Sequence, residues 1–153
     1  MHGLRRKDRE METAKAERLL AEGVYGVLST ADGSGQPYGI PLNYVFRDGA
    51  VYFHCARFGH KLDNLAANPR VSFCVVGKAR VLPEQFSTEY ESVVAFGEAR
   101  EVEGEEKERA LVWLLEKYSP DYLEEGRAYI AREGAAAKVI RIDVSRLTGK
   151  AAS

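Results

Sequence analysis

The amino-acid sequence predicts a single mainly-β domain over residues 1–153, in which an antiparallel sheet closes into a β-barrel with helical insertions. Three observations lead to this prediction. About six segments have the β-branched, aromatic or alternating character of strands. The first of them are joined by turns too short for parallel crossovers, and no GxGxxG motif follows a strand, which argues against a Rossmann fold. Closing such a sheet into a barrel also removes its exposed edges.

The N-terminal third is expected to form one helix followed by three strands. Residues 13–22 have high helix propensity, with Thr13 suited to capping the helix start and Gly23 to ending the helix. Turns that contain glycine then separate three apolar, β-branched and aromatic runs. The strands predicted from these runs cover 24–30, 37–46 and 50–54, in meander order.

The rest of the chain alternates between helical and strand patterns. Leu62 and Leu65 have helical spacing in a segment that Asn68-Pro69 ends. Gly97 interrupts a long β segment and is expected at a bend or bulge. The predicted helices cover 57–67, 105–118 and 121–132, the last two forming a helical insertion at about 104–132, and the predicted strands cover 71–76, 91–102 and 138–144.

Composition narrows the classes of function. The chain is 45% hydrophobic and 29% charged with a net charge of -1, so neither disorder nor nucleic-acid binding is expected. We find no apolar run long enough to span a membrane and no signal peptide, which predicts a cytoplasmic location without membrane association. Cys55 and Cys74 lie in apolar runs and are expected to be buried thiols. Together with His54 and His60 they match no zinc spacing, so no metal site is predicted.

Eight short motifs run along nearly the whole chain: residues 5–7 (RRK), 41–45 (PLNYV), 51–54 (VYFH), 59–63 (GHKLD), 71–76 (VSFCVV), 92–97 (SVVAFG), 117–120 (KYSP) and 147–150 (LTGK). In this order they resemble the Nim-type (5-nitroimidazole resistance) proteins of the pyridoxamine 5'-phosphate oxidase-like FMN-binding split-barrel superfamily. The resemblance implies an antiparallel split barrel that forms a homodimer, with two FMN sites each built from both subunits.

The resemblance also implies an FMN-dependent oxidoreductase that reduces nitroaromatic or quinone-like acceptors with electrons from a reduced nucleotide or another donor. Two alternatives stay open. One is a flavin-storing or sensing module without turnover, and the other is a split barrel that binds haem or a deazaflavin. Pyridoxamine phosphate oxidase activity itself is not expected, because we find no segment that replaces the pyridoxal-phosphate pocket.

Arg57, His60 and Lys61 form a basic group where a strand gives way to a helix. Backbone N–H groups at a helix start and basic side chains both stabilise an anion, so this group suits the FMN phosphate. Taken without the resemblance, a solvated basic helix start explains the same residues. The ring is expected against the second and third strands, where half of the side chains face it; the predicted contacts are Pro41, Leu42, Asn43, Phe53, His54, Cys55 and Ala56, with Ser92 from the second subunit.

His54 is the candidate catalytic acid, because imidazole titrates near neutral pH and nitro reduction consumes protons. A structural histidine is the competing interpretation, and His60 competes for the same role. Tyr38, Tyr44 and Tyr52 share one alternation phase and are expected to make core or dimer contacts.

Overall fold

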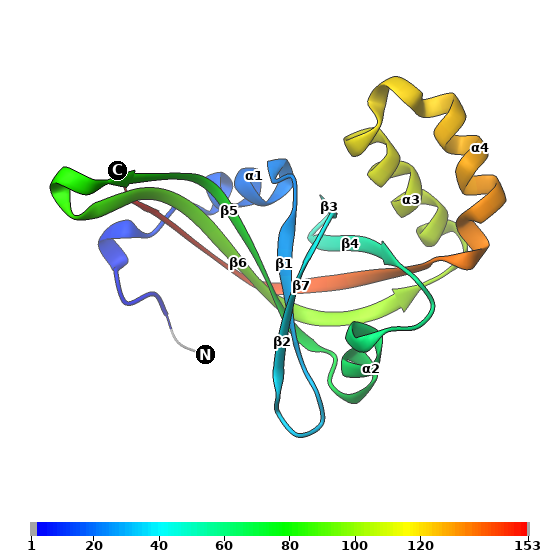
Figure 1. Ribbon diagram of the computed structural model, residues 1–153, viewed down its shortest axis with the longest axis horizontal. Helices are drawn as coiled ribbons and strands as arrows, with labels where there is room; N and C mark the ends of the chain where they lie inside the picture. Colours follow the sequence, from blue (N-terminus) through cyan, green and yellow to red (C-terminus); the bar gives the residue numbers. More distant parts are fainter. Residues whose placement is uncertain (1–2, 153) are drawn as a thin grey trace.

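The computed structural model describes residues 3–152, which form a strongly twisted antiparallel sheet flanked by four helices (Figure 1). The strands are β1 (Gly26–Ala31), β2 (Pro37–Leu42), β3 (Val45–Arg47), β4 (Ala50–Cys55), β5 (Arg70–Leu82), β6 (Ser87–Val102) and β7 (Lys138–Ala152). The helices are α1 (Thr13–Glu22), α2 (His60–Ala67), α3 (Gly104–Tyr118) and α4 (Leu123–Glu133), with single 3-10 turns η1 (Lys7–Arg9), η2 (Pro83–Gln85), η3 (Pro120–Tyr122) and η4 (Gly134–Ala136). The predicted mainly-β antiparallel fold is confirmed.

The sheet curls because β2 and β3, which follow each other in the chain, lie at its two opposite edges. The strand order is β2-β1-β5-β6-β7-β4-β3, and only two residues, Asn43 and Tyr44, connect β2 to β3. Three Cα–Cα steps reach at most about 11 Å, so the two edges of the sheet must come close together. The result is a barrel whose wall is split where β2 and β3 part.

The predicted continuous strand 37–46 and its three-strand meander are therefore wrong. β1 pairs with β2 and β3 pairs with β4, but β2 and β4 do not pair. Contacts from distant parts of the chain explain the break. The hydroxyl of Tyr44 donates to the carbonyl oxygen of Leu20 in α1, and the amide of Asn43 donates to the carbonyl oxygen of Val24 (3.1 Å). Local alternation carries no information on such contacts.

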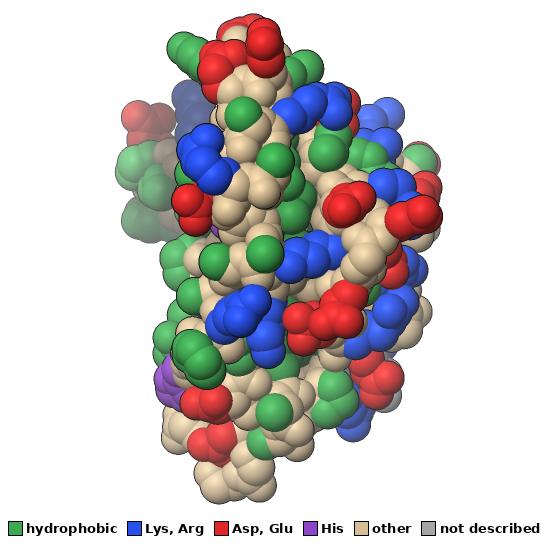
Figure 2. Space-filling model, turned by 90° about the vertical axis from the view of Figure 1, so that its right-hand side faces the viewer, with side chains coloured by type: hydrophobic (Ala, Val, Ile, Leu, Met, Phe, Trp, Pro, Cys, Tyr) green, Lys and Arg blue, Asp and Glu red, His purple; other side chains and the backbone are tan. Residues whose placement is uncertain are grey.

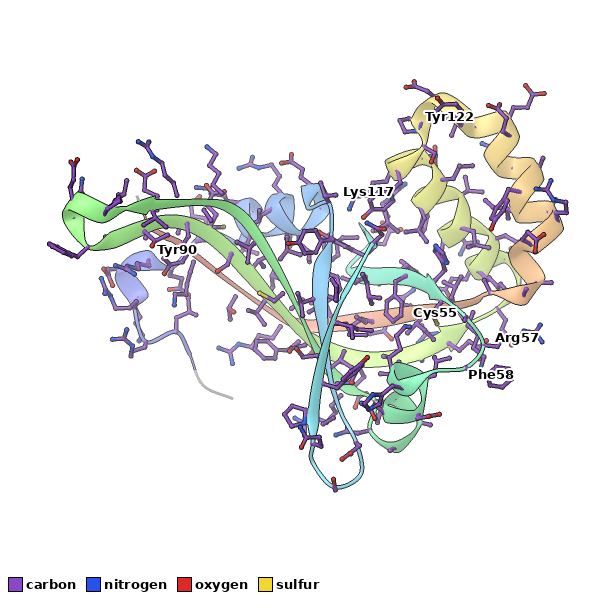
Figure 3. The ribbon with its side chains drawn as sticks, in the orientation of Figure 1. Cys55, Arg57, Phe58, Tyr90, Lys117 and Tyr122 are labelled. Atoms are coloured by element: carbon purple, nitrogen blue, oxygen red, sulfur yellow. The ribbon has the colours of Figure 1, made fainter. Side chains whose placement is uncertain are left out.

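Several predicted element boundaries agree with the structure. The helix predicted at 13–22 is α1, and the register of β6 on β7 shifts between Phe96 and Gly97, so the predicted bulge at Gly97 is confirmed. Strands β5, β6 and β7 are longer than predicted, and their outer parts form an arm that projects past α1 (Figure 1). Most residues of 77–82 are exposed, which removes the alternation that marks a strand. At the base of the arm, Arg9 donates to the hydroxyl of Tyr90 (3.4 Å, Figure 3).

Two apolar clusters lie on opposite faces of β4. The barrel interior contains Leu20, Leu28, Tyr44, Val51, Phe53, Phe73, Val93 and Ile142, among others. The second cluster lies between the outer face of the sheet and α3, and it contains Val45, Ala50, Tyr52, Val102, Ala110, Leu114 and Val139.

The clusters correct the prediction for the tyrosines and one cysteine. Tyr44 and Tyr52 are both buried, as expected, but in different clusters, because the β3–β4 turn pairs Tyr52 with Val45 rather than with Tyr44. Tyr38 instead stacks on His60, with 3.9 Å between ring centroids. Cys55 is buried, whereas Cys74 lies on the outer face of β5 and is only half-buried.

Figure 2 shows the side of the molecule with the outer surface of α4, where basic and acidic side chains are interspersed rather than gathered by sign. None of the helices within residues 3–152 combines the length and the apolar character that crossing a bilayer requires.

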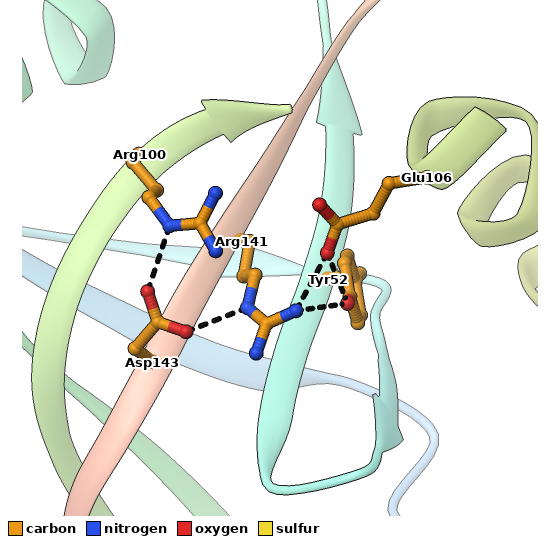
Figure 4. A network of polar contacts seen from close by, with 5 residues as sticks. All are labelled: Tyr52, Arg100, Glu106, Arg141 and Asp143. Carbon is orange, nitrogen blue, oxygen red and sulfur yellow. Dashed lines mark hydrogen bonds and ion pairs between the residues drawn. The ribbon is translucent and has the colours of Figure 1, made fainter. Parts of the chain in front are cut away.

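A polar network fastens α3 to the outer face of the sheet (Figure 4). Arg141 donates to Glu106 (2.6 Å), to the hydroxyl of Tyr52 (2.8 Å) and to Asp143 (2.6 Å). Arg100 also donates to Asp143 (2.9 Å). Hydrogen bonds from Tyr52 and Arg141 lower the pKa of Glu106. Burial disfavours the charge on Asp143, but bonds from Arg141 and Arg100 leave its pKa below the ordinary value.

Replacing Glu106 with glutamine is expected to destabilise the fold by about 1 kcal/mol at pH 7, a small value because the pair is partly solvated. A carboxylate whose folded-state pKa is depressed stabilises the fold above its unfolded pKa, and this contribution is lost as the pH falls through the folded value. The difference from wild type should therefore shrink below about pH 4.5, the ordinary Glu value. Urea unfolding at pH 7 and pH 3.5 measures it. Glu105→Gln, on an exposed neighbour, is the control and should have no such effect.

Candidate functional site

The junction between β4 and α2 exposes a helix start with no side-chain cap. Gly59 has a φ of +153°, a conformation that favours glycine, and its carbonyl accepts the N–H of Asp63 (3.1 Å). No side chain bonds to the first turn of α2, so its leading N–H groups are available to a ligand. Arg57 and Phe58 extend outward from this loop (Figure 3), and Phe58 is 88% exposed.

The three predicted basic residues meet at this junction in different states. Arg57 donates to the carbonyl oxygen of Ala135 in η4 (2.6 Å), which ties the loop to the end of the α3–α4 hairpin. His60 is stacked on Tyr38. Lys61 is half-buried and takes part in none of the ion pairs found in residues 3–152. Lys61 is therefore the cation at the junction that a ligand can engage without displacing a partner.

Lys61 also lies near the end of β4. Burial raises the pKa of the Cys55 thiol, and the positive charges of Lys61 and Lys138 partly oppose this rise. Lys138 differs from Lys61 because it pairs with Glu101 (3.7 Å). Among the residues that the structure describes, no group of three or more His, Cys, Asp or Glu side chains is arranged to hold a metal ion.

The predicted ring-contact residues divide between the two faces of the sheet. Leu42, Phe53 and Cys55 pack in or against the barrel interior, and Phe53 is completely buried. Phe53 and Cys55 can therefore meet an outside ligand only through their backbone, whereas Leu42 is partly buried. Pro41, Asn43, His54 and Ala56 are exposed. The sequence predicted that half of the ring-contact side chains would face the ring without showing which half. The structure shows that the outward-facing half consists of these four residues.

His54 and Asn43 lie at the floor of a groove of about 650 Å³ between β4 and the α3–α4 hairpin. Val45 pairs with Tyr52. Asn43 lies two residues before Val45 and His54 two residues after Tyr52, so the same register brings Asn43 near His54. His54 makes no side-chain hydrogen bond within residues 3–152. Although part of its side chain is exposed, the surrounding protein desolvates the imidazole and lowers its pKa. Its imidazole is therefore mainly neutral at pH 7, which makes it a hydrogen-bonding group rather than a ready proton source.

The end of α3 holds the β2–β3 connection in place. The hydroxyl of Tyr118 donates to the carbonyl oxygen of Val24 (2.6 Å) and accepts the N–H of Tyr44 (3.0 Å). The ammonium of Lys117 donates to the carbonyl oxygen of Tyr44 (2.9 Å) and lies 3.9 Å from the centroid of its ring. Burial lowers the pKa of Lys117 to about 8. These contacts keep Asn43 in position and give a structural role to the KYSP motif (Lys117 in Figure 3).

Ser92 lies on the outer face of the sheet, away from the groove. It pairs with Val76, and the adjacent cross-strand row on this face is Pro41, Val27, Cys74 and Val94. Val27 is 36% and Val76 59% exposed, so this apolar stretch of sheet is uncovered in the single chain. The face therefore connects Pro41 to the neighbourhood of Ser92.

The groove walls are the residues that sequence reasoning missed. They come from α3, α4 and η3, which form the helical insertion predicted at about 104–132. The signal in the sequence that could have indicated them is the group of three tyrosines, Tyr118, Tyr122 and Tyr129, in one predicted helical hairpin.

The antiparallel sheet curls into a barrel whose wall is parted between β2 and β3, and the candidate site lies at the β4–α2 junction. This arrangement defines a split-barrel protein. The family model described as pyridoxamine 5'-phosphate oxidase matches residues 12–151. The chain belongs to this pyridoxamine 5'-phosphate oxidase family, in which flavin binding is typical. A search of curated proteins found no match.

Solved structures from several bacteria are similar to this fold. A candidate 5-nitroimidazole antibiotic resistance protein from Bacteroides thetaiotaomicron is 23% identical, with a TM-score of 0.76 over 92% of this chain and 85% of that one. A FAD-binding protein from Mesorhizobium loti is 26% identical, with a TM-score of 0.71 over 95% and 98%. A FAD- and haem-binding protein from Mycobacterium smegmatis is 17% identical, with a TM-score of 0.81 over 95% and 74%.

Proposed function

We propose that the chain binds FMN at the β4–α2 junction and acts as a flavin-dependent oxidoreductase on nitroaromatic or quinone-like acceptors. One observation carries the proposal: Lys61 has no ion-pair partner among the described residues and stands in the uncapped first turn of α2. A phosphate there would meet both the free N–H groups of the helix start and a charged side chain.

The residues of the site fit both the phosphate and the ring of a flavin. The phosphate would be held by Lys61 and the first turn of α2, with His60 and Arg57 alongside. The ring would lie against the outward residues Pro41, Asn43, His54 and Ala56, close to backbone groups that can bond its edge. The flavin supplies the electron-transfer chemistry when bound, whereas the chain binds it, orients it and offers the neutral imidazole of His54 beside it.

A homodimer is part of the proposal. The uncovered apolar row on β1, β2, β5 and β6 runs from Pro41 toward Ser92. A second copy on this face would cover Val27 and Val76 and would bring its own Ser92 near the flavin of the first copy.

A haem-binding split barrel is the second candidate. The observation that favours it is the imidazole of His54, which faces a groove and makes no side-chain hydrogen bond in the described part of the chain. Haem requires an axial ligand, and histidine is the most common one. A structure of the same fold binds haem as well as FAD, which keeps this candidate open.

The absorption spectrum of the purified protein tests both candidates. We expect flavin bands and no haem Soret band, and mass spectrometry of the released cofactor should identify FMN rather than FAD. Reduced under anaerobic conditions, the flavin should then be reoxidised when a 5-nitroimidazole or a quinone is added. Flavin that stays reduced would indicate a storage or sensing module, and a protein that takes up no flavin would refute the proposal.

A further inference from the structure

The groove above His54 has an apolar and aromatic wall. Leu111, Leu114 and Leu115 line it from α3, and Ile130 lines it from α4. Tyr122 and Tyr129 also line it and are 63% and 60% exposed, so most of each ring is in contact with solvent. Tyr122 lies at the turn between the two helices (Figure 3). A volume of about 650 Å³ is within the range of small-molecule sites.

Two polar groups of the groove already have hydrogen-bond partners within the chain. The amide nitrogen of Asn43 donates to Val24, and the hydroxyl of Tyr118 donates to Val24 and accepts from Tyr44. The imidazole of His54 keeps both nitrogens free of partners within residues 3–152. A ligand in this groove therefore finds apolar walls, the imidazole of His54 at the floor and the hydroxyl groups of Ser119, Tyr122 and Tyr129.

The charges of the groove disfavour an anion. Three charged side chains line it, Arg132, Glu125 and Glu133, which leaves a net charge of one negative unit. The guanidinium of Arg132 lies over the ring of Tyr129, 5.6 Å from its centroid. A phosphate ester needs a surplus of cations or helix-start N–H groups. The groove has no surplus of cations, and the start of α4 that lines it carries two glutamates in its first turn, which oppose an anion. Of the cations at the junction, Arg57 is bound to the carbonyl oxygen of Ala135 and Lys61 is already assigned to the flavin phosphate.

From these contacts we propose that the α3–α4 groove is the acceptor site and selects neutral, planar aromatic molecules of the quinone or nitroarene class over phosphate esters. The proposal rests on the proposed function for its chemistry, since His54 belongs to both sites. Tyr122 and Tyr129 stack on the faces of the acceptor, and His54 bonds its carbonyl or nitro oxygen. Binding of the acceptor itself does not require the flavin, because all of these groups belong to the chain.

Calorimetric titration of flavin-loaded and flavin-free protein tests the proposal. The probes are 2,3-dimethyl-1,4-naphthoquinone, whose blocked ring positions prevent addition of cysteine thiols, and pyridoxine 5'-phosphate. We expect the quinone to bind both forms. The phosphate ester should not compete with the quinone for binding to either form. The double variant Tyr122→Ala/Tyr129→Ala should raise the quinone Kd by about tenfold, near the lower end of the range for two lost aromatic contacts, with the FMN Kd unchanged. Phe86→Ala is the matched control, an aromatic residue that is 97% exposed at the end of the β5–β6 arm, outside the groove, and should leave both values unchanged.

Each outcome has a separate meaning for the two proposals. A double variant that binds the quinone as wild type does, or a phosphate ester that displaces the quinone, overturns the acceptor site. Quinone binding that depends on the two tyrosines in a protein unable to bind FMN would support the groove while the flavin function fails. Loss of the circular-dichroism spectrum in the double variant would shift the measurement to the single variants, each of which should raise the Kd by a few-fold.

Discussion

Replacing Gly97 with alanine is expected to lower the stability of the fold by roughly 3 kcal/mol or more. A Cβ atom at this position would lie 2.1 Å from the carbonyl oxygen and 2.9 Å from the carbonyl carbon of Asp143. These atoms are backbone, so they cannot rotate away as the end of a side chain can. Relief requires β6 and β7 to separate at the bulge, in the longest strand pairing of the sheet. For a chain of this size the melting temperature should fall by about 6–12 °C.

Gly39→Ala is the matched control for this experiment. Gly39 also lies within a strand, but a Cβ atom there would meet Val27 and Ser29 at 3.5 and 3.7 Å, which are ordinary contact distances. Its melting temperature should stay within a few degrees of wild type. Equal melting temperatures for the two alanine variants would show that the bulge relaxes freely, against the prediction.

Gly97 illustrates what a sequence can reveal about this fold. A glycine inside an apolar strand indicates a close backbone approach, and this local signal was sufficient to place the bulge. The helix at 13–22 was equally local, with a start, a periodic body and a glycine end. The break after Leu42 had no such signal, because hydrogen bonds from residues 20, 24 and 118 create it. The lengths of the strands in the arm were underestimated, because these exposed segments do not alternate between buried apolar and exposed polar residues.

The candidate site also contains one part that could be predicted from local sequence and one part that could not. Arg57, His60 and Lys61 are close in sequence, so their meeting at one junction follows from any strand-to-helix turn there. The orientation of the β2 and β4 residues depends on which face becomes the interior, and buried partners such as Phe73 decide this. The groove combines residue 43 with residues 54 and 111–137, so no local pattern could reveal it.

Lys61→Ala is expected to weaken FMN binding by about 10- to 100-fold, with little change in melting temperature of the flavin-free protein. A charged hydrogen bond to a phosphate contributes about 1.5–3 kcal/mol, and this variant removes it. The stability should be retained because the ammonium of Lys61 makes no ion pair within residues 3–152 and its truncation opens no cavity in the barrel interior. Quenching of flavin fluorescence on titration into flavin-free protein measures the Kd. Lys61→Arg should recover most of the affinity, since it restores the charge at the helix start.

Lys138→Ala separates a phosphate contact from the general effect of positive charge. Both lysines act on the thiol of Cys55, so they are near the same end of β4, but Lys138 is occupied by Glu101. If Lys61 holds the phosphate directly, the Lys138 variant should lose less than about threefold in FMN affinity, because an exposed pair contributes little and charge alone acts weakly in solvent. Raising the salt concentration should then weaken wild-type binding more than binding by the Lys61→Ala variant. Equal losses for the two alanine variants would mean that the junction attracts the flavin only through its overall charge, and an unchanged Kd for Lys61→Ala would remove the junction as the phosphate site.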